Sequence, residues 1–134
     1  LSLRRLIMKK PTIVIPIGDA AGIGPEITVK ALAADAVHEM ARILVVGDKK
    51  VLNKALAFSN VDLTINDICK PAEGHFAPGI VNLIDLDNIQ MDKMKMGAVQ
   101  AMTGKAAYEY IEVAMEKTAR SYVFYDAIRI CPPG

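Results

Sequence analysis

The residues best suited to chemistry in this chain lie in one short stretch, GDAAGIGPE, at positions 18–26. Glycine tolerates positive φ and lets a ligand approach the backbone closely. The N–H groups at a helix N-terminus can bind an anion or a polar group. The spacing G-x3-G-x-G matches neither the dinucleotide fingerprint nor the Walker loop, which needs Lys-Ser/Thr after its last glycine. On the residues alone, a ligand-binding loop and a purely structural bend are equally well supported.

Two acidic residues of this stretch and the two histidines are the polar site candidates. Asp19 and Glu26 are suited to acting on a substrate or holding a cation, but Asp19 can instead satisfy loop N–H groups and Glu26 can complement the dipole of a helix. The structural interpretation is favoured for Glu26. His38 and His75 are the only two histidines, too few for a zinc or iron site built on them. Both are expected to be surface histidines.

The sulfur-containing residues give no clear site. Met91, Met94 and Met96 fall in QMDKMKMG, where a soft-metal or partner surface is one interpretation. The favoured one is that the methionines pack while the lysines stay solvated. Cys69 and Cys131 match no ligand or redox spacing, which fits a cytoplasmic protein. No Ser-His-Asp, Cys-His or paired-carboxylate arrangement is present, so the residues alone name no reaction.

Composition narrows the class of protein. The 134 residues are 52% hydrophobic and 23% charged, with a net charge of +1 from 16 basic and 15 acidic residues. This is a folded globular composition for one compact domain. Because the chain lacks the excess of basic residues that nucleic-acid binding requires, we expect no nucleic-acid partner. No apolar run is long enough to span a membrane.

The elements that must position the loop follow from hydrophobic patterning. Residues 12–17 form an apolar run, predicted to be a strand buried on both faces, and Pro16 indicates an irregular end or a sheet edge. Further strands are predicted at 43–46, 61–67 and 80–86.

Three helices are predicted between these strands. The first begins at Pro25, which suits the first helical position, and ends near Asp35 or Met40. Asp48 is a good N-cap for the second, whose apolar stripe is Val51, Leu52, Ala55, Leu56 and Phe58. Residues 70–79 are predicted to be loop. The third helix covers residues 98–118, with apolar positions at Val99, Met102, Ala106, Tyr110, Ile111, Val113 and Ala114.

This order of elements predicts an α/β fold, with a mainly parallel sheet and helices on both faces. A sheet cut short exposes an edge and an apolar face, which favours self-association. We therefore expect an oligomer.

The stretch IPIGDAAGIGPEITVKAL closely resembles the N-terminal signature of the 4-hydroxythreonine-4-phosphate dehydrogenase family, with Ala20 where the family most often has proline. ARILVVGDKKVLNKAL, GIVNLIDL and GAVQAMTGKAAYEYIEVAMEKTA follow in the family's order. The motif is also similar to that of isocitrate and isopropylmalate dehydrogenases. The resemblance covers about Lys9 to Ala119 and implies their α/β fold, in a truncated form.

The resemblance implies a cofactor-binding role, mostly through the backbone, for one loop: Gly18, Asp19, Ala20, Ala21, Gly22, Ile23 and Gly24. It also implies NAD or NADP as cofactor, a divalent metal (Zn, Mg or Co) and a homodimer. The family's metal ligands and substrate-binding residues lie beyond the long helix. The resemblance therefore assigns no catalytic or metal-binding residue to this chain, and we expect the chain alone to be inactive.

The implied reaction is NAD(P)-dependent oxidation of a phosphorylated four-carbon hydroxy acid. In the namesake enzyme of pyridoxine biosynthesis, decarboxylation follows. D-threonate or D-erythronate 4-phosphate is the alternative substrate in the same family, and the Gly-Asp-Ala variant favours that branch. A non-catalytic α/β binding module is the second alternative. A phosphotransferase loop is disfavoured because no Lys-Ser/Thr follows the glycines.

Three segments are expected from this comparison. Residues 1–7 are an upstream or extraneous leader, because Met8 begins an ordinary protein start. Residues 8–119 are the N-terminal α/β portion of a dehydrogenase. Residues 120–134 are a divergent tail from a frameshift or a cloning step, because ARSYVFYDAIRICPPG replaces the family's valine-rich strand.

Overall fold

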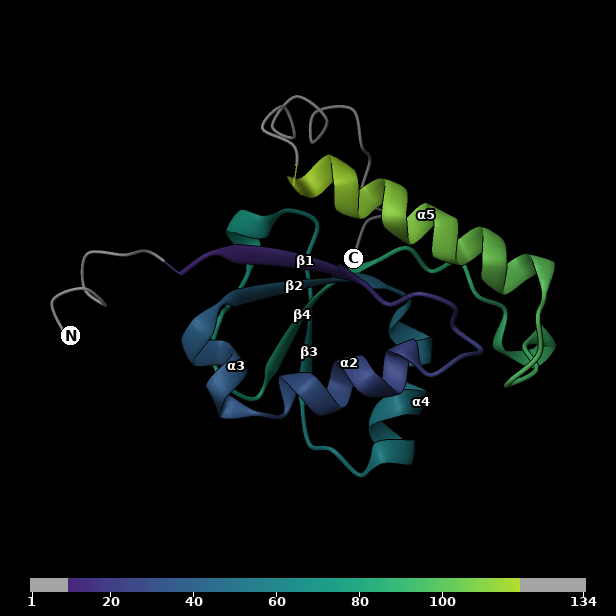
Figure 1. Cartoon of the computed structure of the whole chain (residues 1–134), viewed down its shortest axis with the longest axis horizontal. Helices are drawn as coiled ribbons and strands as arrows, with labels where there is room; N and C mark the ends of the chain where they lie inside the picture. The colour runs from purple at the N-terminus through teal and green to yellow at the C-terminus, as the bar shows by residue number, and fades with distance from the viewer. Residues whose placement is uncertain (1–9, 119–134) are drawn as a thin grey trace, which may run out of the picture.

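The computed structural model describes residues 10–118, which form one parallel β-sheet flanked by helices (Figure 1). Within these residues the sheet has four strands in the order β1-β2-β4-β3, and each neighbouring pair is parallel. The strands are β1 (Thr12–Pro16), β2 (Arg42–Gly47), β3 (Thr64–Asp67) and β4 (Ile80–Asp85). The helices are α2 (Gly24–Leu32), α3 (Asp35–Met40), α4 (Lys49–Ser59) and α5 (Ala101–Thr118), with short 3₁₀ turns η1 (Pro71–Glu73) and η2 (Met91–Lys93). The expected leader 1–7, the expected tail 120–134 and Cys131 lie outside the described residues.

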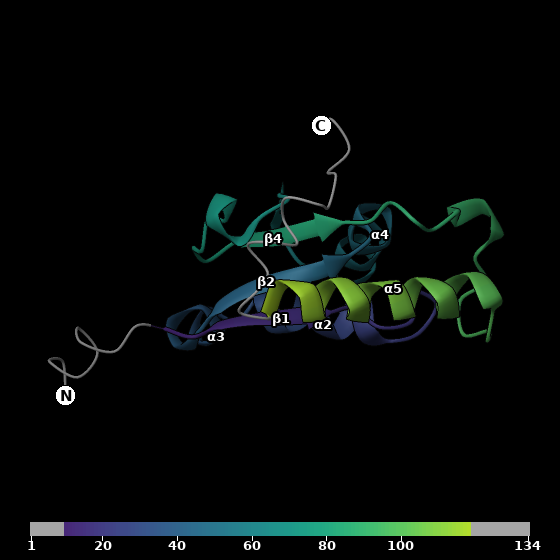
Figure 2. The ribbon, with the colours of Figure 1, turned by 90° about the horizontal axis from the view of Figure 1, so that it is seen from above.

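Helices cover both faces of the sheet, as the order of elements predicted. α2, α3 and α4 lie on one face, where α2 packs on α4, and α5 lies on the other face against β1 and β2 (Figures 1 and 2). β2 has a strand on each side and helices above and below. Leu44, Val45 and Val46 are therefore fully buried, as predicted for a strand of a parallel sheet. The predicted α/β fold is confirmed.

β1 differs from the prediction of a strand buried on both faces. Its first residues are exposed, with Ile13 at 45%, because β1 has a neighbour on one side only within the described sheet. Pro16 was correctly predicted to mark an edge. The N–H of the next residue, Ile17, donates to the Val46 carbonyl of β2 at 3.0 Å. Because backbone groups alternate along a strand, the Pro16 nitrogen faces away from β2, and no ladder hydrogen bond is lost.

The first predicted helix is two helices in the structure. α2 ends at Leu32, and α3 begins at Asp35 after an extended Ala34. His38 of α3 explains the break, because its Nε2–H donates to the Leu32 carbonyl at 2.7 Å and so satisfies a terminal group of α2. His38 is buried, and the prediction of a surface position for it was wrong. His75 is exposed, as predicted.

α4 follows its prediction closely, with one exception. Asp48 caps the N-terminus by accepting hydrogen bonds from the Lys50 and Val51 N–H groups, and Asn60 ends the helix in the left-handed region at φ 53°. Val51, Leu52 and Ala55 are buried. Phe58, predicted on the same apolar stripe, is 77% exposed.

α5 begins three residues later than predicted, at Ala101. Gln100 explains the shift, because its side chain accepts from the Lys95 N–H at 2.8 Å and donates to the Lys93 carbonyl at 3.0 Å. These bonds hold residues 93–100 in an irregular turn. Val99 is therefore fully exposed and not part of the helix face, contrary to the prediction, and Ile111 is also exposed. The other side of α5 buries Ala106, Tyr110, Val113 and Ala114, as predicted.

The segment between β3 and β4 is held by one buried side chain. β3 is shorter than predicted and begins at Thr64, where its pairing with β4 starts. Asn82 of β4 accepts from the Asn66 side chain at 2.9 Å and from the His75 N–H at 2.8 Å, and donates to the His75 carbonyl at 3.0 Å. This cross-link fixes the loop that contains η1 over the sheet.

Candidate functional site

The glycine-rich loop lies at the carboxyl edge of the sheet. Because all four described strands are parallel, the segments that follow β1, β2 and β4 emerge at the same edge. Ligands of open α/β sheets bind in this position. The loop 18–24 predicted from the sequence therefore lies where such a fold holds a ligand.

Two of the three loop glycines are required by the backbone itself. Gly18 has φ +79°, a left-handed conformation that disfavours other residues. A Cβ on Gly24 would lie 2.1 Å from the Ile17 carbonyl oxygen, so only glycine allows α2 to begin against the end of β1. Gly22 is less constrained, since its Cβ would lie 3.4 Å from the Asp19 carbonyl oxygen. The bend therefore has a structural role in addition to any role in binding.

The two acidic residues of the loop are engaged locally. Asp19 Oδ1 accepts from the Ala21 N–H at 2.8 Å, which is the structural role considered for it from the sequence. Glu26 lies in the first turn of α2 and pairs with Lys30 at 2.6 Å, in agreement with the favoured structural interpretation. Ala20 and Ala21 are buried, whereas Ile23 is 69% exposed. The side chain that the loop offers to a ligand is therefore Ile23.

A pocket of about 420 Å³ adjoins the loop. Its walls are loop residues 20–23, the first turn of α2, the inner side of α4 and the segment before α5. Met94 and Met96 line it, and the Gly97 N–H donates to the Ala21 carbonyl at 2.7 Å, which fixes this segment against the loop. Met91 and Met94 pack against the core and Lys93 and Lys95 are exposed, as predicted, but Met96 is 54% exposed, contrary to the prediction. The sequence did not predict that the methionines and the loop share a pocket.

Buried Asp48 joins β2 to the segment after β4. Besides capping α4, its Oδ2 accepts from the Ile89 N–H at 3.0 Å and from Lys50 Nζ at 3.2 Å. Lys50 also pairs with Asp87. Burial lowers the pKa of Lys50, but the hydrogen bonds to Asp87 and Asp48 outweigh it and raise the pKa above its ordinary value. Because both oxygens of the buried Asp48 carboxylate accept hydrogen bonds from within the fold, this carboxylate is structural.

Tyr110 of α5 reaches the same edge from the other face of the sheet. Its hydroxyl donates to Asn88 Oδ1 at 2.7 Å, and the Asn88 amide donates to Glu109 at 3.3 Å. Burial, followed by the charges of Asp48, Asp85 and Glu109, raises the pKa of Tyr110 above its ordinary value. The phenol therefore remains a neutral hydrogen-bond donor at neutral pH. It was assigned to the core from the sequence, and nothing local marked it as part of a polar network.

Asp67 is a further acidic residue and lies at the end of β3. Burial raises the pKa of Asp67, repulsion from Asp85 raises it further, and Lys49 opposes both. Asp85 Oδ1 accepts from the N–H groups of Lys49 and Asp87 at 3.0 and 2.9 Å. Asp85 therefore organises the turns at this edge of the sheet.

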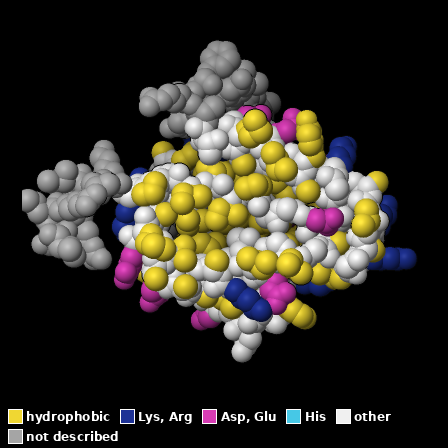
Figure 3. Space-filling model, in the orientation of Figure 1, with side chains coloured by type: hydrophobic (Ala, Val, Ile, Leu, Met, Phe, Trp, Pro, Cys, Tyr) yellow, Lys and Arg dark blue, Asp and Glu magenta, His cyan; other side chains and the backbone are white. Residues whose placement is uncertain are grey.

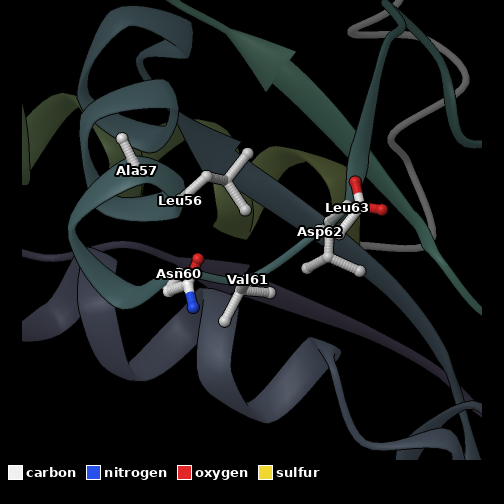
Figure 4. Close-up of a pocket in the computed structure, with 6 residues that line it drawn as sticks. All are labelled: Leu56, Ala57, Asn60, Val61, Asp62 and Leu63. Atoms are coloured by element: carbon white, nitrogen blue, oxygen red, sulfur yellow. The ribbon is translucent and has the colours of Figure 1, made fainter.

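The described residues do not form a metal site. Within residues 10–118, no group of three or more His, Cys, Asp or Glu side chains is arranged to hold a metal ion. A smaller hollow of about 280 Å³ lies at the end of α4, and its six lining residues include one charged side chain, Asp62 (Figure 4). The described geometry thus supports binding at the loop and its pocket, and assigns no nucleophile or general base. No helix of this part of the chain is long and apolar enough to cross a membrane.

Curated relatives are similar over nearly the whole chain. A protein of Clostridium botulinum, provisionally named D-threonate 4-phosphate dehydrogenase, is 47% identical over 95% of this chain and 37% of its own length. One of Halalkalibacterium halodurans with the same provisional name is 48% identical over 81% of this chain and 32% of its own. The chain thus spans about a third of the length of these relatives.

Solved structures share the fold. The 4-hydroxythreonine-4-phosphate dehydrogenase of Burkholderia phymatum is 38% identical with a TM-score of 0.78, over 81% of this chain and 33% of that one. The Klebsiella pneumoniae enzyme is 30% identical with a TM-score of 0.74, over 90% and 35% of the two chains. The family model described as pyridoxal phosphate biosynthetic protein PdxA matches residues 39–132, continuing past Ala119, where the sequence resemblance was expected to end. Since that match covers more than half of the chain, the chain belongs to the PdxA family.

Proposed function

We propose that residues 8–119 are the N-terminal portion of a dehydrogenase that oxidises a phosphorylated four-carbon hydroxy acid with NAD or NADP. The observation that carries the proposal is the position of the glycine-rich loop at the carboxyl edge of a parallel sheet, in a chain that belongs to the PdxA family. D-threonate 4-phosphate is the proposed substrate, because relatives with that provisional name are 45–48% identical. 4-Hydroxythreonine 4-phosphate, named for the more distant solved structures, is the alternative, and decarboxylation would follow its oxidation.

The loop fits a nicotinamide cofactor through its backbone. The first N–H groups of α2, those of Gly24 and Glu26, have no partner within the helix, and Ile23 makes no side-chain cap. Space around Gly18 is open, with no heavy atom within 4 Å of a Cβ position. We propose that Gly18, Asp19, Ala20, Ala21, Gly22, Ile23 and Gly24 face the cofactor. The bound cofactor would accept the hydride, while these residues position it and Ile23 contacts it.

The divalent metal of the family, Zn, Mg or Co, does not fit residues 10–118, because they contain no suitable group of ligands. We therefore assign no metal-dependent step to this part of the chain. The proposed enzyme is cytoplasmic and acts as a homodimer. The 134-residue chain alone is expected to show no turnover, and measurable oxidation of either substrate would contradict this.

Calorimetric titration tests the cofactor assignment. The full chain is titrated with NAD, NADP and each phosphorylated acid, with and without Mg²⁺ or Zn²⁺. We expect cofactor binding that Ile23→Ala weakens about three- to tenfold, the effect of losing part of a contacting isoleucine. Ile27→Ala is the matched control, because Ile27 lies on the next turn of α2 with a comparable exposed fraction, 55% against 69% for Ile23. Binding of neither cofactor nor acid would instead favour a non-catalytic α/β module.

A further inference from the structure

The pocket beside the glycine-rich loop has the size and lining of a small-molecule site. Its volume of about 420 Å³ falls within the range of about 300–1,000 Å³ found for ligand pockets. Met94, Met96 and Phe58 contribute to its walls. Methionine side chains adapt to flat ligands, and sulfur contacts with aromatic rings are favourable. The walls are thus suited to a planar apolar group.

Three large hydrophobic side chains are exposed around this one pocket. Ile23, Phe58 and Met96 line it, and each leaves more than half of its surface accessible. They come from the loop, from α4 and from the segment before α5, three parts of the chain that are distant in sequence. Exposed apolar side chains that gather at one concave place mark binding surfaces more often than scattered ones do.

The charges at the pocket favour a negatively charged ligand. Glu26 lines it, but its carboxylate is paired with Lys30 Nζ at 2.6 Å. Lys54 also lines it, is exposed, and forms no ion pair with a carboxylate among residues 10–118. Lys54 is therefore the lining charge that no opposite charge in this part of the chain neutralises. A ligand with an apolar ring and an anionic substituent would match both the walls and Lys54.

We propose that this pocket binds a planar aromatic carboxylate, with the ring between Phe58 and the two methionines and the carboxylate on Lys54. The ring would displace water from the apolar walls, and the charge would orient the molecule at the mouth. The site shares a wall with the proposed cofactor loop but does not rest on the proposed function, since its test contains no cofactor.

The methionines allow a test within the unmodified chain. The full 134-residue protein is labelled with ¹³C at the methionine methyl groups and titrated with 1-naphthoate. The ring current of a bound naphthalene is expected to shift the Met94 and Met96 signals saturably. Met40 on α3 and Met115 on α5 are exposed but do not line the pocket, so their signals should not move. Equal shifts at all four methionines, or no saturable shift at all, would overturn the proposal.

The charge requirement is tested separately with 1-naphthylmethanol, which has the same ring and no charge. 1-Naphthoate should bind about two- to fivefold more tightly, the effect of one exposed ion pair. Lys54→Gln should abolish that preference, and Lys105→Gln, an exposed lysine on α5, should keep it. Both substitutions are at exposed positions, and the methionine spectrum reports whether each variant is folded. Equal affinity of the two ligands for the unmodified chain, or an unchanged preference in Lys54→Gln, would overturn the proposal.

Discussion

Gly24 and Gly104 are both helical glycines, but the atoms around them differ. Gly24 is the first residue of α2, and its missing side chain is what lets the helix start against the Ile17 carbonyl. Gly104 lies in α5, and nothing is within 4 Å of where its Cβ would be. The first glycine is therefore required by packing, whereas the second only weakens its helix.

We predict opposite effects for alanine at these positions. Gly24→Ala places a Cβ 2.1 Å from a backbone oxygen and should destabilise the chain by about 3 kcal/mol, the upper end of overpacking effects. Gly104→Ala should stabilise it by about 0.5–1 kcal/mol through helix propensity. Urea unfolding followed by circular dichroism measures both. A Gly24→Ala variant as stable as the parent would show that α2 does not start as described.

Asp67 gives a prediction of pH dependence. Burial and the charge of Asp85 raise its pKa above the ordinary value of 3.8, so the folded state binds its proton more tightly than the unfolded state does. Stability from this group is present below pH 3.8 and is lost as the pH rises through the folded pKa. At neutral pH the charged carboxylate therefore opposes folding.

Asp67→Asn should raise the Tm at pH 7, and the gain should shrink as the pH falls toward 3.5. Asp62→Asn is the control, because Asp62 is an exposed carboxylate just before β3. Thermal unfolding of the parent and both variants at several pH values measures the effect. A gain in Tm for Asp67→Asn that is the same at every pH would contradict the assigned direction.

At the scale of elements, Asp48 connects three segments that the sheet brings together. It follows the last residue of β2, caps α4 and accepts from the Ile89 N–H after β4. The cap is visible in the sequence because it joins neighbouring residues. The bond to Ile89 depends on β4 pairing beside β2, which only the folded sheet brings about.

Asp48→Ala should destabilise the chain by about 2–4 kcal/mol, combining the loss of a helix cap with a buried N–H left without an acceptor. Asp35→Ala is the matched control, because Asp35 begins α3, is exposed and makes no cap hydrogen bond. Its effect should be within about 0.5 kcal/mol. Denaturant unfolding measures the free energy of unfolding of both variants. Similar losses of stability for Asp48→Ala and Asp35→Ala would argue against a structural role for Asp48 beyond its charge.

At the scale of the molecule, β1 forms one edge of the sheet built by residues 10–118, and its first residues are exposed. Figure 3 shows hydrophobic side chains gathered between α5 and α2, on the face where β1 forms the sheet edge. Ile13 of β1 and Ile27 of α2 are both exposed. A strand with a neighbour on one side only, beside exposed apolar side chains, favours pairing with another chain. This surface supports the expectation that the chain self-associates.

Sedimentation velocity should show a concentration-dependent oligomer for the parent chain. Ile13→Lys should shift it toward monomer, because a charge on an edge strand opposes pairing. Phe58→Lys should leave the oligomer unchanged. Phe58 is also exposed, but it lies on α4, which packs on α2. A parent chain that is strictly monomeric at high concentration would contradict the expectation, as would an equal effect of the two substitutions.

The α/β class, the Asp48 cap, the end of α4 and the edge character of β1 could all be predicted because local patterns carry them. A proline, a cap residue or a continuous apolar run limits backbone conformation whatever lies around it. The family signature at residues 18–26 likewise identified the loop that lies at the carboxyl edge of the sheet. Each of these features depends only on residues that are close together in the sequence.

The exposure of Phe58, Val99 and Ile13, the burial of His38 and the pocket between the loop and the methionines were decided by the tertiary structure. Each depends on which distant segment lies against the residue. His38 is buried because its helix returns to the end of α2, and Ile13 is exposed because β1 has one neighbouring strand in the described sheet. Met94 and Phe58 line one pocket only because the Gly97–Ala21 hydrogen bond fixes the segment before α5 near α4. Hydrophobic periodicity predicts that a side chain is suited to burial, but burial itself requires a partner surface, which the sequence does not specify locally.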